Sequence, residues 1–230
     1  MKYLDSSLKN SNKIYRYIPV YRLLEILSLN KLTFMKTNMW EDPFEGFLYN
    51  YCVNEFSQWE KFSNLKTTVF CLCFSSDSEK DQIWRSYTPN RDGVRMKMNL
   101  VALESSLGDE YILGKVHYKT VNIIKRLLRK YRNDAKPCKE KLLKLFFLKR
   151  KSFENDVEVR LITTDSLITG DVKSIDVNAK GMIKEVMFDP RMDDGLFASY
   201  RSLLKSKAYD FKGKVHKSKL YSPAKVFENI

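Results

Sequence analysis

The stretch "FENDVEVRLI", residues 153–162, carries an alternating pattern that is typical of a β-strand. At a period of two residues, apolar side chains fall on one side of the strand and charged side chains on the other. The apolar set is Val157, Val159 and Leu161, and the charged set is Asp156, Glu158 and Arg160. The charged side either faces solvent or lines a pocket, and the pattern alone leaves both interpretations open.

The segments around this strand predict an α+β fold with mixed, mainly antiparallel sheets around a central cleft. The nearly continuous apolar run "TTVFCLCFS" (67–75) predicts a second, fully buried strand. Helices are expected after residue 20, with a stop at Asn30, and over 79–87, 120–150 and 195–209, where the pair within 120–150 breaks near Pro137. Further strands are expected at 12–20, 31–36, 94–98, 111–119, 184–190 and 213–221.

Length and composition favour a single domain over 1–230 with a helical insertion at about 120–150. The formal net charge is +13, and thirteen Lys or Arg residues lie between Lys119 and Lys151. Basic helices of this kind are either solvated faces or surfaces for a phosphate-bearing partner. The candidate nucleic-acid contacts are Lys125, Arg126, Arg129 and Lys130.

Several classes of protein have no support in this sequence. The four cysteines lack the paired spacing of a structural zinc site or a disulfide framework, so no metal site is expected. Neither a Gly-x-Gly-x-x-Gly motif nor a P-loop is present. No stretch approaches the ~20 apolar residues of a membrane span, and the N-terminus lacks a signal-peptide pattern, so a cytoplasmic protein without a membrane partner is expected.

Five blocks in order resemble an uncharacterised family of bacterial domains. They are "YRY" (15–17), "EDPFE" (41–45), "CFS" (73–75), "WRSYTPNRDGV" (84–94) and "DVEVR" (156–160). This resemblance covers most of the chain and names a family, but it implies no reaction.

Three of the blocks are also distantly similar to ADP-ribosyltransferases of the Arg–Ser–Glu class. Those enzymes carry an Arg on the first strand, a Ser on a core strand and a late acid-x-Glu pair, and Arg16, Ser75 and Asp156-x-Glu158 follow in that order. The resemblance implies an NAD-dependent enzyme whose catalytic Glu is Glu158. It departs from the family pattern at Asp156, where the family has Glu or Gln.

Cleavage of the nicotinamide–ribose bond of NAD passes through an oxocarbenium-like cation, which a carboxylate on the ribose 2′-hydroxyl stabilises. Glu158 is the candidate for this role, and Asp156 the candidate for activating an acceptor. NAD itself would be bound by a guanidinium on the pyrophosphate, a hydroxyl on the ribose and stacked rings. The candidates are Arg16, Ser75, Tyr17, Trp84 and Tyr87.

Each candidate also has a purely structural interpretation. Glu158 and Arg160 are residues that commonly form salt bridges to charged side chains on a neighbouring strand at a solvent-exposed face. Arg16 is a plausible partner for the acids of "EDPFE". Trp84 and Tyr87 have the i, i+3 spacing of core residues on a helix. Glu45 either caps a turn or reaches the site as an extra acid.

Three functions therefore compete. The first is transfer of ADP-ribose from NAD to a nucleic-acid or protein acceptor, as in a toxin or a phage-defence effector. The second is a non-catalytic nucleic-acid-binding module that uses the basic helices over 119–151. The third is a metal-dependent nuclease built on Glu45, Asp156 and Glu158 with Lys149 or Lys151, whose spacing matches no known nuclease motif.

Overall fold

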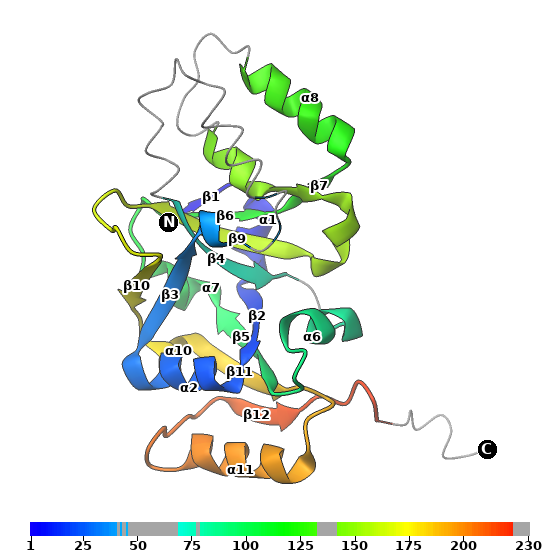
Figure 1. The fold of residues 1–230 in the computed structure, drawn as a ribbon. Coiled ribbons are helices and arrows are strands. Elements are labelled where there is room, and N and C mark those ends of the chain that lie inside the picture. The colour runs from blue at the N-terminus through cyan, green and yellow to red at the C-terminus, as the bar shows by residue number, and fades with distance from the viewer. Residues whose placement is uncertain (41, 43–44, 46–68, 77–78, 133–141, 223–230) are drawn as a thin grey trace, which may run out of the picture. The chain divides into compact units, whose positions relative to one another are not determined.

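The structure, a computed structural model, describes residues 1–40, 42, 45, 69–76, 79–132 and 142–222. The contacts divide the chain into two compact units, each assembled from segments that are distant in sequence (Figure 1). Unit 1 comprises Met1–Ser11, Leu32–Ser75 and Leu107–Ile175, and unit 2 comprises Asn12–Lys31, Ser76–Ser106 and Asp176–Ile230. A single domain with an insertion at 120–150 stays a prediction.

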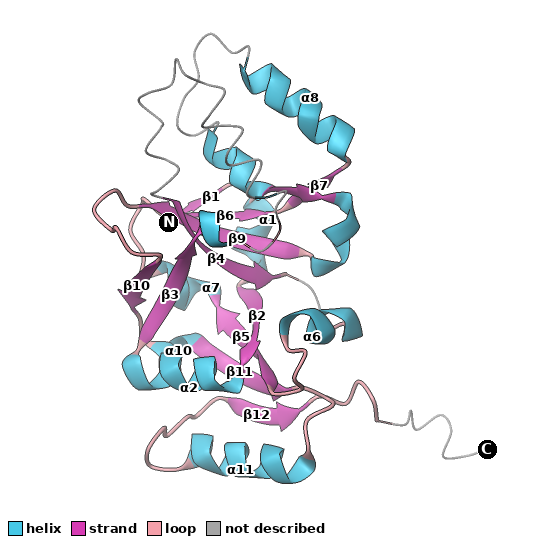
Figure 2. Ribbon diagram, viewed as in Figure 1, coloured by secondary structure: helices cyan, strands magenta, loops and turns pink. Residues whose placement is uncertain are grey.

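Unit 1 is mainly a β-structure with one long helix, as the colouring by element in Figure 2 shows. Its elements in chain order are β1 (Lys2–Tyr3), α1 (Ser6–Ser11), β3 (Lys31–Lys36), η1 (Thr37–Met39), β4 (Val69–Ser75), β6 (Ile112–Lys115), β7 (His117–Lys119), α8 (Val121–Arg132), η3 (Lys144–Phe147), β8 (Leu148–Arg150), η4 (Lys151–Asp156), β9 (Glu158–Thr164) and β10 (Val172–Asp176).

The sheet of unit 1 has the strand order β1-β6-β9-β4-β3-β10. Strands β6 and β4 flank β9 and run antiparallel to it, β3 is antiparallel to β4, and β1 is parallel to β6. A separate pair, β7 with β8, is parallel. The central position of β9 explains why its backbone is hydrogen-bonded on both sides and why almost all of its side chains are buried.

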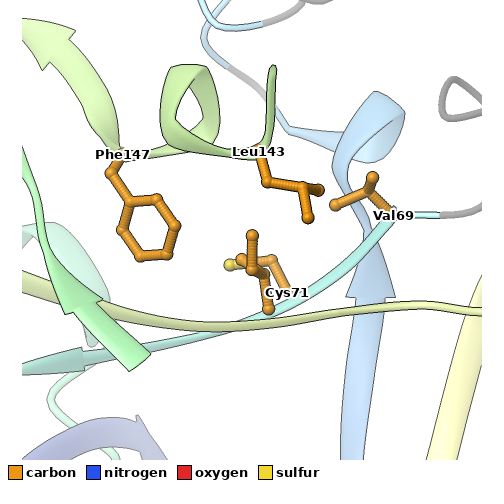
Figure 3. Close-up of a cluster of buried hydrophobic side chains, with 5 residues drawn as sticks. Val69, Cys71, Leu143 and Phe147 are labelled. Atoms are coloured by element: carbon orange, nitrogen blue, oxygen red, sulfur yellow. The ribbon is translucent and has the colours of Figure 1, made fainter. Parts of the chain in front are cut away.

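One face of this sheet carries an apolar cluster beneath η3. Figure 3 shows Leu143 and Phe147 lying over Val69 and Cys71, and Ile162 completes the cluster. Gly114 on β6 makes the close approach possible, since a Cβ there would lie 2.8 Å from the Phe147 ring. Leu143 and Phe147 thereby fix η3 onto the sheet, and η3 leads directly into β8, which carries Lys149.

Unit 2 combines a mainly antiparallel strand set with five helices among its described residues. Its elements are β2 (Lys13–Pro19), α2 (Val20–Leu29), α6 (Asp81–Tyr87), β5 (Gly93–Asn99), α7 (Leu100–Glu104), α10 (Ala179–Met182), β11 (Ile183–Phe188), α11 (Asp194–Lys205) and β12 (Lys214–Lys217). Strand β5 lies between β2 and β11 and is antiparallel to both, and β12 is parallel to β11.

The helices of unit 2 follow from apolar spacing and from local signals at their ends. In α2 the residues Leu23, Ile26 and Leu27 are buried, at the i, i+3, i+4 spacing of one helical face. The helix ends at Asn30, whose backbone is left-handed at φ 52°. Helix α11 begins at Asp193, whose side chain accepts a hydrogen bond of 2.9 Å from the Leu196 backbone N–H.

The predicted fold class is confirmed as a mixed α+β arrangement with mainly antiparallel strands. The expected strands at 12–20, 31–36, 94–98 and 184–190 and the helices at 20–29 and 79–87 are present with small shifts of their ends. The strand expected at 67–75 is β4, with 67–68 outside the described residues, and the elements expected at 195–209 and 213–221 end four residues early, at Lys205 and Lys217. The cleft and the basic insertion stay predictions.

Three expectations are wrong in detail. The strand expected at 111–119 is two strands, β6 and β7, because Val116 leaves the first ladder and the next residues pair with β8. The second helix within 120–150 does not continue through 142–148: it gives way to the 3-10 turn η3 and then to β8. The predicted break near Pro137 lies outside the described residues. Strand β9 begins at Glu158, so Asp156 does not share its face.

Among the described residues, no helix combines the length and the apolar character that crossing a membrane requires.

Candidate functional site

The charged side chains of β9 do not face solvent. Glu158 and Arg160 point to one face of the strand and are 3% and 1% exposed, while Val159 and Leu161 fill the other face. Charged groups at this depth are costly unless each is paired and hydrogen-bonded. The open question of the alternating pattern is thus decided in favour of a buried polar site.

Arg160 organises this site through every part of its guanidinium group. Nε and Nη2 donate to the two carboxylate oxygens of Glu158 at 2.9 and 3.2 Å. Nη2 also donates to Glu45 at 2.5 Å, and Nη1 donates to the Phe146 carbonyl at 2.6 Å. The guanidinium lies 4.2 Å from the centroid of the Trp40 ring, which covers it. Glu45 therefore reaches the site as an extra acid, as one of its two interpretations expected.

Lys149, from β8, supplies the second cation. Its ammonium group donates to Glu158 Oε2 at 3.0 Å and to Asp156 Oδ2 at 3.1 Å. The side chain is 10% exposed and lies 4.9 Å from the Phe153 ring centroid. Lys149 thus joins the two acids that the sequence places two residues apart.

Asp156 reaches Lys149 from outside the strand. It ends the 3-10 turn η4, and Val157 between the turn and β9 has a left-handed backbone at φ 44°. This conformation is rare for a β-branched residue. It redirects the chain so that Asp156 and Glu158 meet one ammonium group, although only Glu158 belongs to the strand.

Ser75 lies at the end of β4, where its Cα is the register partner of Glu158. Its hydroxyl donates to the Asp156 backbone carbonyl at 3.2 Å. On the other side, the Glu158 backbone N–H donates to the Tyr118 hydroxyl at 2.7 Å. The structure therefore brings Ser75, Asp156 and Glu158 together within unit 1.

The surrounding charges fix the ionisation of the central carboxylate. Burial by itself raises the pKa of Glu158, but Arg160 and Lys149 outweigh that effect and lower it to about 2. Burial also raises the pKa of Glu45, against the attraction of Arg160 and Lys149. The pKa of Lys149 is raised: burial opposes its charge, but the attraction of Glu158 and Glu45 prevails. Glu158 is consequently a permanent anion at neutral pH and not a proton shuttle.

Some members of this site carry no signal that sequence analysis recognises. Tyr118 and Trp40 come from segments that show only ordinary strand or loop composition. Cys73, the register partner of Arg160, also contributes a hydrogen bond that lowers the pKa of Glu158. Phe153, whose ring lies beside Lys149, belongs to the quoted stretch 153–162, but its composition gave no reason to single it out.

The aromatic candidates lie in unit 2. Tyr17 and Trp84 pack edge to face with ring centroids 4.8 Å apart, and Tyr87 lies 6.4 Å from Tyr17. Trp84 is fully buried and its indole N–H donates to Glu79 at 2.7 Å, so it is a core residue of this unit, with Ile83 and Met187 as neighbours. Their proposed stacking on NAD stays a prediction.

Arg16 points to the opposite face of β2 from Tyr17, because adjacent residues on a strand alternate. It lies on the side of Ile14 and Ile18, which are both buried. Arg16 and Tyr17 therefore lie on opposite faces of this sheet, although they are neighbours in the block "YRY". A pyrophosphate contact by Arg16 stays a prediction.

Helix α8 presents a basic face. Ile124 and Leu128, four residues apart, are buried on one side of the helix. The four candidate nucleic-acid contacts are exposed on the other side, and they are Lys125, Arg126, Arg129 and Lys130. Nucleic-acid binding by this face stays a prediction.

In the part of the chain that the structure describes, no cluster of three or more His, Cys, Asp or Glu side chains is arranged to hold a metal ion. The three acids of the nuclease hypothesis are instead bound to Lys149 and Arg160. A metal would have to displace both cations, which argues against that hypothesis.

No protein-family model and no curated protein matches the chain, so the resemblance to the bacterial domain family stays a prediction. Among solved structures, Thermus sp. 2.9 DarT is distantly similar in complex with NAD+, with carba-NAD+ and with ADP-ribosylated ssDNA, with TM-scores of 0.41, 0.40 and 0.41. The identities are 11%, 10% and 11%, over 91%, 90% and 91% of this chain and 96%, 95% and 95% of the others. A likeness of this size carries no functional argument, so function is inferred from this chain's own residues.

Proposed function

We propose that the chain is an ADP-ribosyltransferase-like enzyme that cleaves NAD and transfers ADP-ribose to a nucleic-acid or protein acceptor. One observation carries the proposal. Glu158 is held as an anion by Arg160 and Lys149, with Asp156 and Ser75 beside it. Of these residues, Ser75, Asp156 and Glu158 are the ones that the resemblance to the Arg–Ser–Glu class selects, while its fourth residue, Arg16, belongs to unit 2.

The chemistry follows from the permanent charge of Glu158. As the bond between nicotinamide and C1′ of the ribose breaks, nicotinamide leaves with the electron pair and positive charge develops on the sugar. A fixed carboxylate on the 2′-hydroxyl stabilises that charge. The acceptor then forms a bond to C1′ and gives its proton to Asp156. Because Glu158 is 3% exposed, a substrate reaches it only when covering side chains move aside on binding.

The proposal assigns further residues to the two substrates. Arg16 would bind the pyrophosphate, and Tyr17 and Tyr87 would stack on the rings of NAD, while Trp84, which is fully buried, would take part only through its edge-to-face contact with Tyr17. The exposed cations of α8 would hold a nucleic-acid acceptor. In a cell, such an activity suits a cytoplasmic toxin or a phage-defence effector.

The test is nicotinamide release from NAD by the purified chain, with and without added nucleic acid or protein. Wild type should turn NAD over, and Glu158→Gln should lose at least about a hundredfold in rate, which is typical for the loss of one charge-stabilising group. An NAD-induced rise in melting temperature is a second measurement.

Glu45→Gln is the matched control, because it also removes one carboxylate from Arg160 but leaves the proposed catalytic group intact. Its rate should fall far less than that of Glu158→Gln when both variants are folded. Wild-type chain that neither binds nor consumes NAD with any of these acceptors would contradict the proposal.

A second candidate function is nucleic-acid binding without catalysis. The exposed basic face of α8 is the observation that favours it. In that case the logarithm of the affinity for nucleic acid falls linearly with the logarithm of the salt concentration, and the affinity does not change in Glu158→Gln.

A further inference from the structure

A single ammonium group lies between the two acids of the proposed site. Lys149 Nζ is 3.0 Å from Glu158 Oε2 and 3.1 Å from Asp156 Oδ2. Both contacts are charge-assisted hydrogen bonds, which are about twice as strong as neutral ones. Because Lys149 is 10% exposed and Asp156 is 11% exposed, water competes weakly for these bonds.

The other groups around Glu158 do not make this connection. Arg160 is engaged by Glu158, Glu45 and the Phe146 carbonyl. Tyr118 bonds the Glu158 backbone, and Cys73 contributes a further hydrogen bond to its carboxylate. Of the cations that the structure describes at this site, Lys149 is the one bonded to both Asp156 and Glu158.

The backbone of Val157, between the two acids, has a conformation that is rare for a β-branched residue. The strand begins only after Val157, whose φ of 44° is unfavourable for a β-branched side chain. A β-branched residue favours extended backbone, so the left-handed turn at Val157 needs contacts that hold it. Two such contacts are the bond from Lys149 to the Asp156 carboxylate and the bond from Ser75 to the Asp156 carbonyl.

We propose that Lys149 is a positioning residue that couples Asp156 to Glu158 and thereby directs the ribosyl group to the acceptor instead of to water. The inference rests on the proposed function. When nicotinamide has left C1′, an acceptor O–H or N–H must lose its proton as its bond to C1′ forms. Asp156 takes that proton if it is held beside the ribose. Without that placement, water completes the reaction and free ADP-ribose is the product.

The experiment measures two products in one reaction. Nicotinamide release reports total NAD cleavage, and label from NAD bound to the acceptor reports transfer. The acceptors offered are mixed-sequence RNA and DNA oligonucleotides and a total protein extract. The variants are Lys149→Met, Lys149→Arg and Asp156→Asn, with Glu45→Gln as the control that disturbs the same buried charge cluster without touching Asp156.

Lys149→Met and Asp156→Asn should each lower the ratio of transfer to nicotinamide release by about tenfold or more, since a general base contributes ~10²–10⁴ in rate. Lys149→Arg restores a cation and should recover most of the ratio, and Glu45→Gln should leave it unchanged. A purely structural lysine would lower both products together and keep the ratio constant.

The outcomes separate the two proposals. Wild-type chain without nicotinamide release overturns the proposed function and this inference with it. Active wild type with an unchanged ratio in Lys149→Met overturns the inference alone. If Lys149→Met does not fold, Asp156→Asn decides the matter, because an unchanged ratio in that variant is equally incompatible with the coupling.

Discussion

Glu158 lies at the centre of a buried ion cluster that it forms with Arg160, Lys149, Asp156 and Glu45. In the sequence Glu158 is one of the charged residues in an alternating pattern, and such residues usually face solvent. In the structure its charge is balanced by Arg160 on the same strand and by Lys149 from β8. The decisive partners come from other segments, and for this reason the pattern of residues 153–162 could not choose between solvent and pocket.

Because Glu158 is stabilised as an anion by Arg160 and Lys149, we expect Glu158→Gln to lower the free energy of unfolding. Its pKa of about 2, against 4.5 for a free Glu, corresponds to about 3 kcal/mol of stabilisation in the ionised form. Because the folded pKa is the lower one, this contribution is complete above about pH 4.5 and disappears as the pH falls toward 2. Denaturant unfolding of wild type and variant should differ by about 3 kcal/mol at pH 7, and the two curves should converge below pH 4.5.

Glu45→Gln again provides the comparison. Burial raises the pKa of Glu45, so its contribution has the opposite sign: it is complete below about pH 4.5 and diminishes as the pH rises. Glu45→Gln should therefore cost less than Glu158→Gln at pH 7. Equal losses for the two variants, or a difference that does not depend on pH, would contradict the assigned charge states.

At the scale of elements, sequence patterns identified the long ones and missed the short ones. Strand β4 could be predicted from its nearly continuous apolar run, and helices α2 and α11 from the helical spacing of their apolar residues. Strand β1, helix α7 and helix α10 have five residues or fewer and offer no period to recognise. Strand β9 starts at Glu158, after the Asp156 and Val157 positions of the alternating pattern, because Val157 favours a strand by composition but adopts a left-handed backbone.

The C-terminal end of α2 allows a test of this local chemistry. Asn30 has φ 52° and an exposed side chain, so its role is conformational. Asn30→Gly should be neutral or slightly stabilising, because Gly adopts a left-handed backbone without steric cost. Asn30→Ala should lower the free energy of unfolding by about 1 kcal/mol. Thermal or denaturant unfolding of the pair measures the difference, and equal stabilities would show that the left-handed cap is unimportant.

Val157 allows a second test, at the start of β9. Its left-handed backbone costs a β-branched residue about 1–2 kcal/mol, and Asn tolerates this conformation better. Val157→Asn should therefore raise the free energy of unfolding by about 1 kcal/mol. Val172→Asn, at an exposed strand position with ordinary backbone, is the control and should be neutral or mildly destabilising. A loss of stability in Val157→Asn would mean that the contacts of the valine outweigh its strain.

At the scale of the molecule, the interleaving of the two units limits what sequence order can reveal. The chain enters unit 1, passes to unit 2 and returns twice, so neither unit is a contiguous segment. The predicted site residues divide in the same way: Ser75, Asp156 and Glu158 belong to unit 1, and Arg16, Tyr17, Trp84 and Tyr87 to unit 2. No local period in the sequence could assign them to units.

The net charge of +13 gives the last prediction, because two basic regions can be compared at equal charge. Replacing the four α8 cations Lys125, Arg126, Arg129 and Lys130 by Gln should weaken nucleic-acid binding and lower the salt slope. Each lost phosphate contact reduces the slope of log affinity against log salt by about 0.7–0.9. The control replaces four exposed cations near the C-terminus, Arg201, Lys207, Lys214 and Lys219.

Both variants lose four positive charges, so a general electrostatic effect would change them equally. A specific α8 surface predicts a slope that falls by up to about 3 in the α8 variant and by much less in the control. Fluorescence anisotropy with a labelled oligonucleotide at several salt concentrations measures both slopes. If the two variants lose affinity in parallel, the net charge of the chain accounts for binding and α8 is only a solvated helix. If the α8 variant alone loses its acceptor labelling while nicotinamide release persists, the helix holds the acceptor and the ion cluster performs the cleavage.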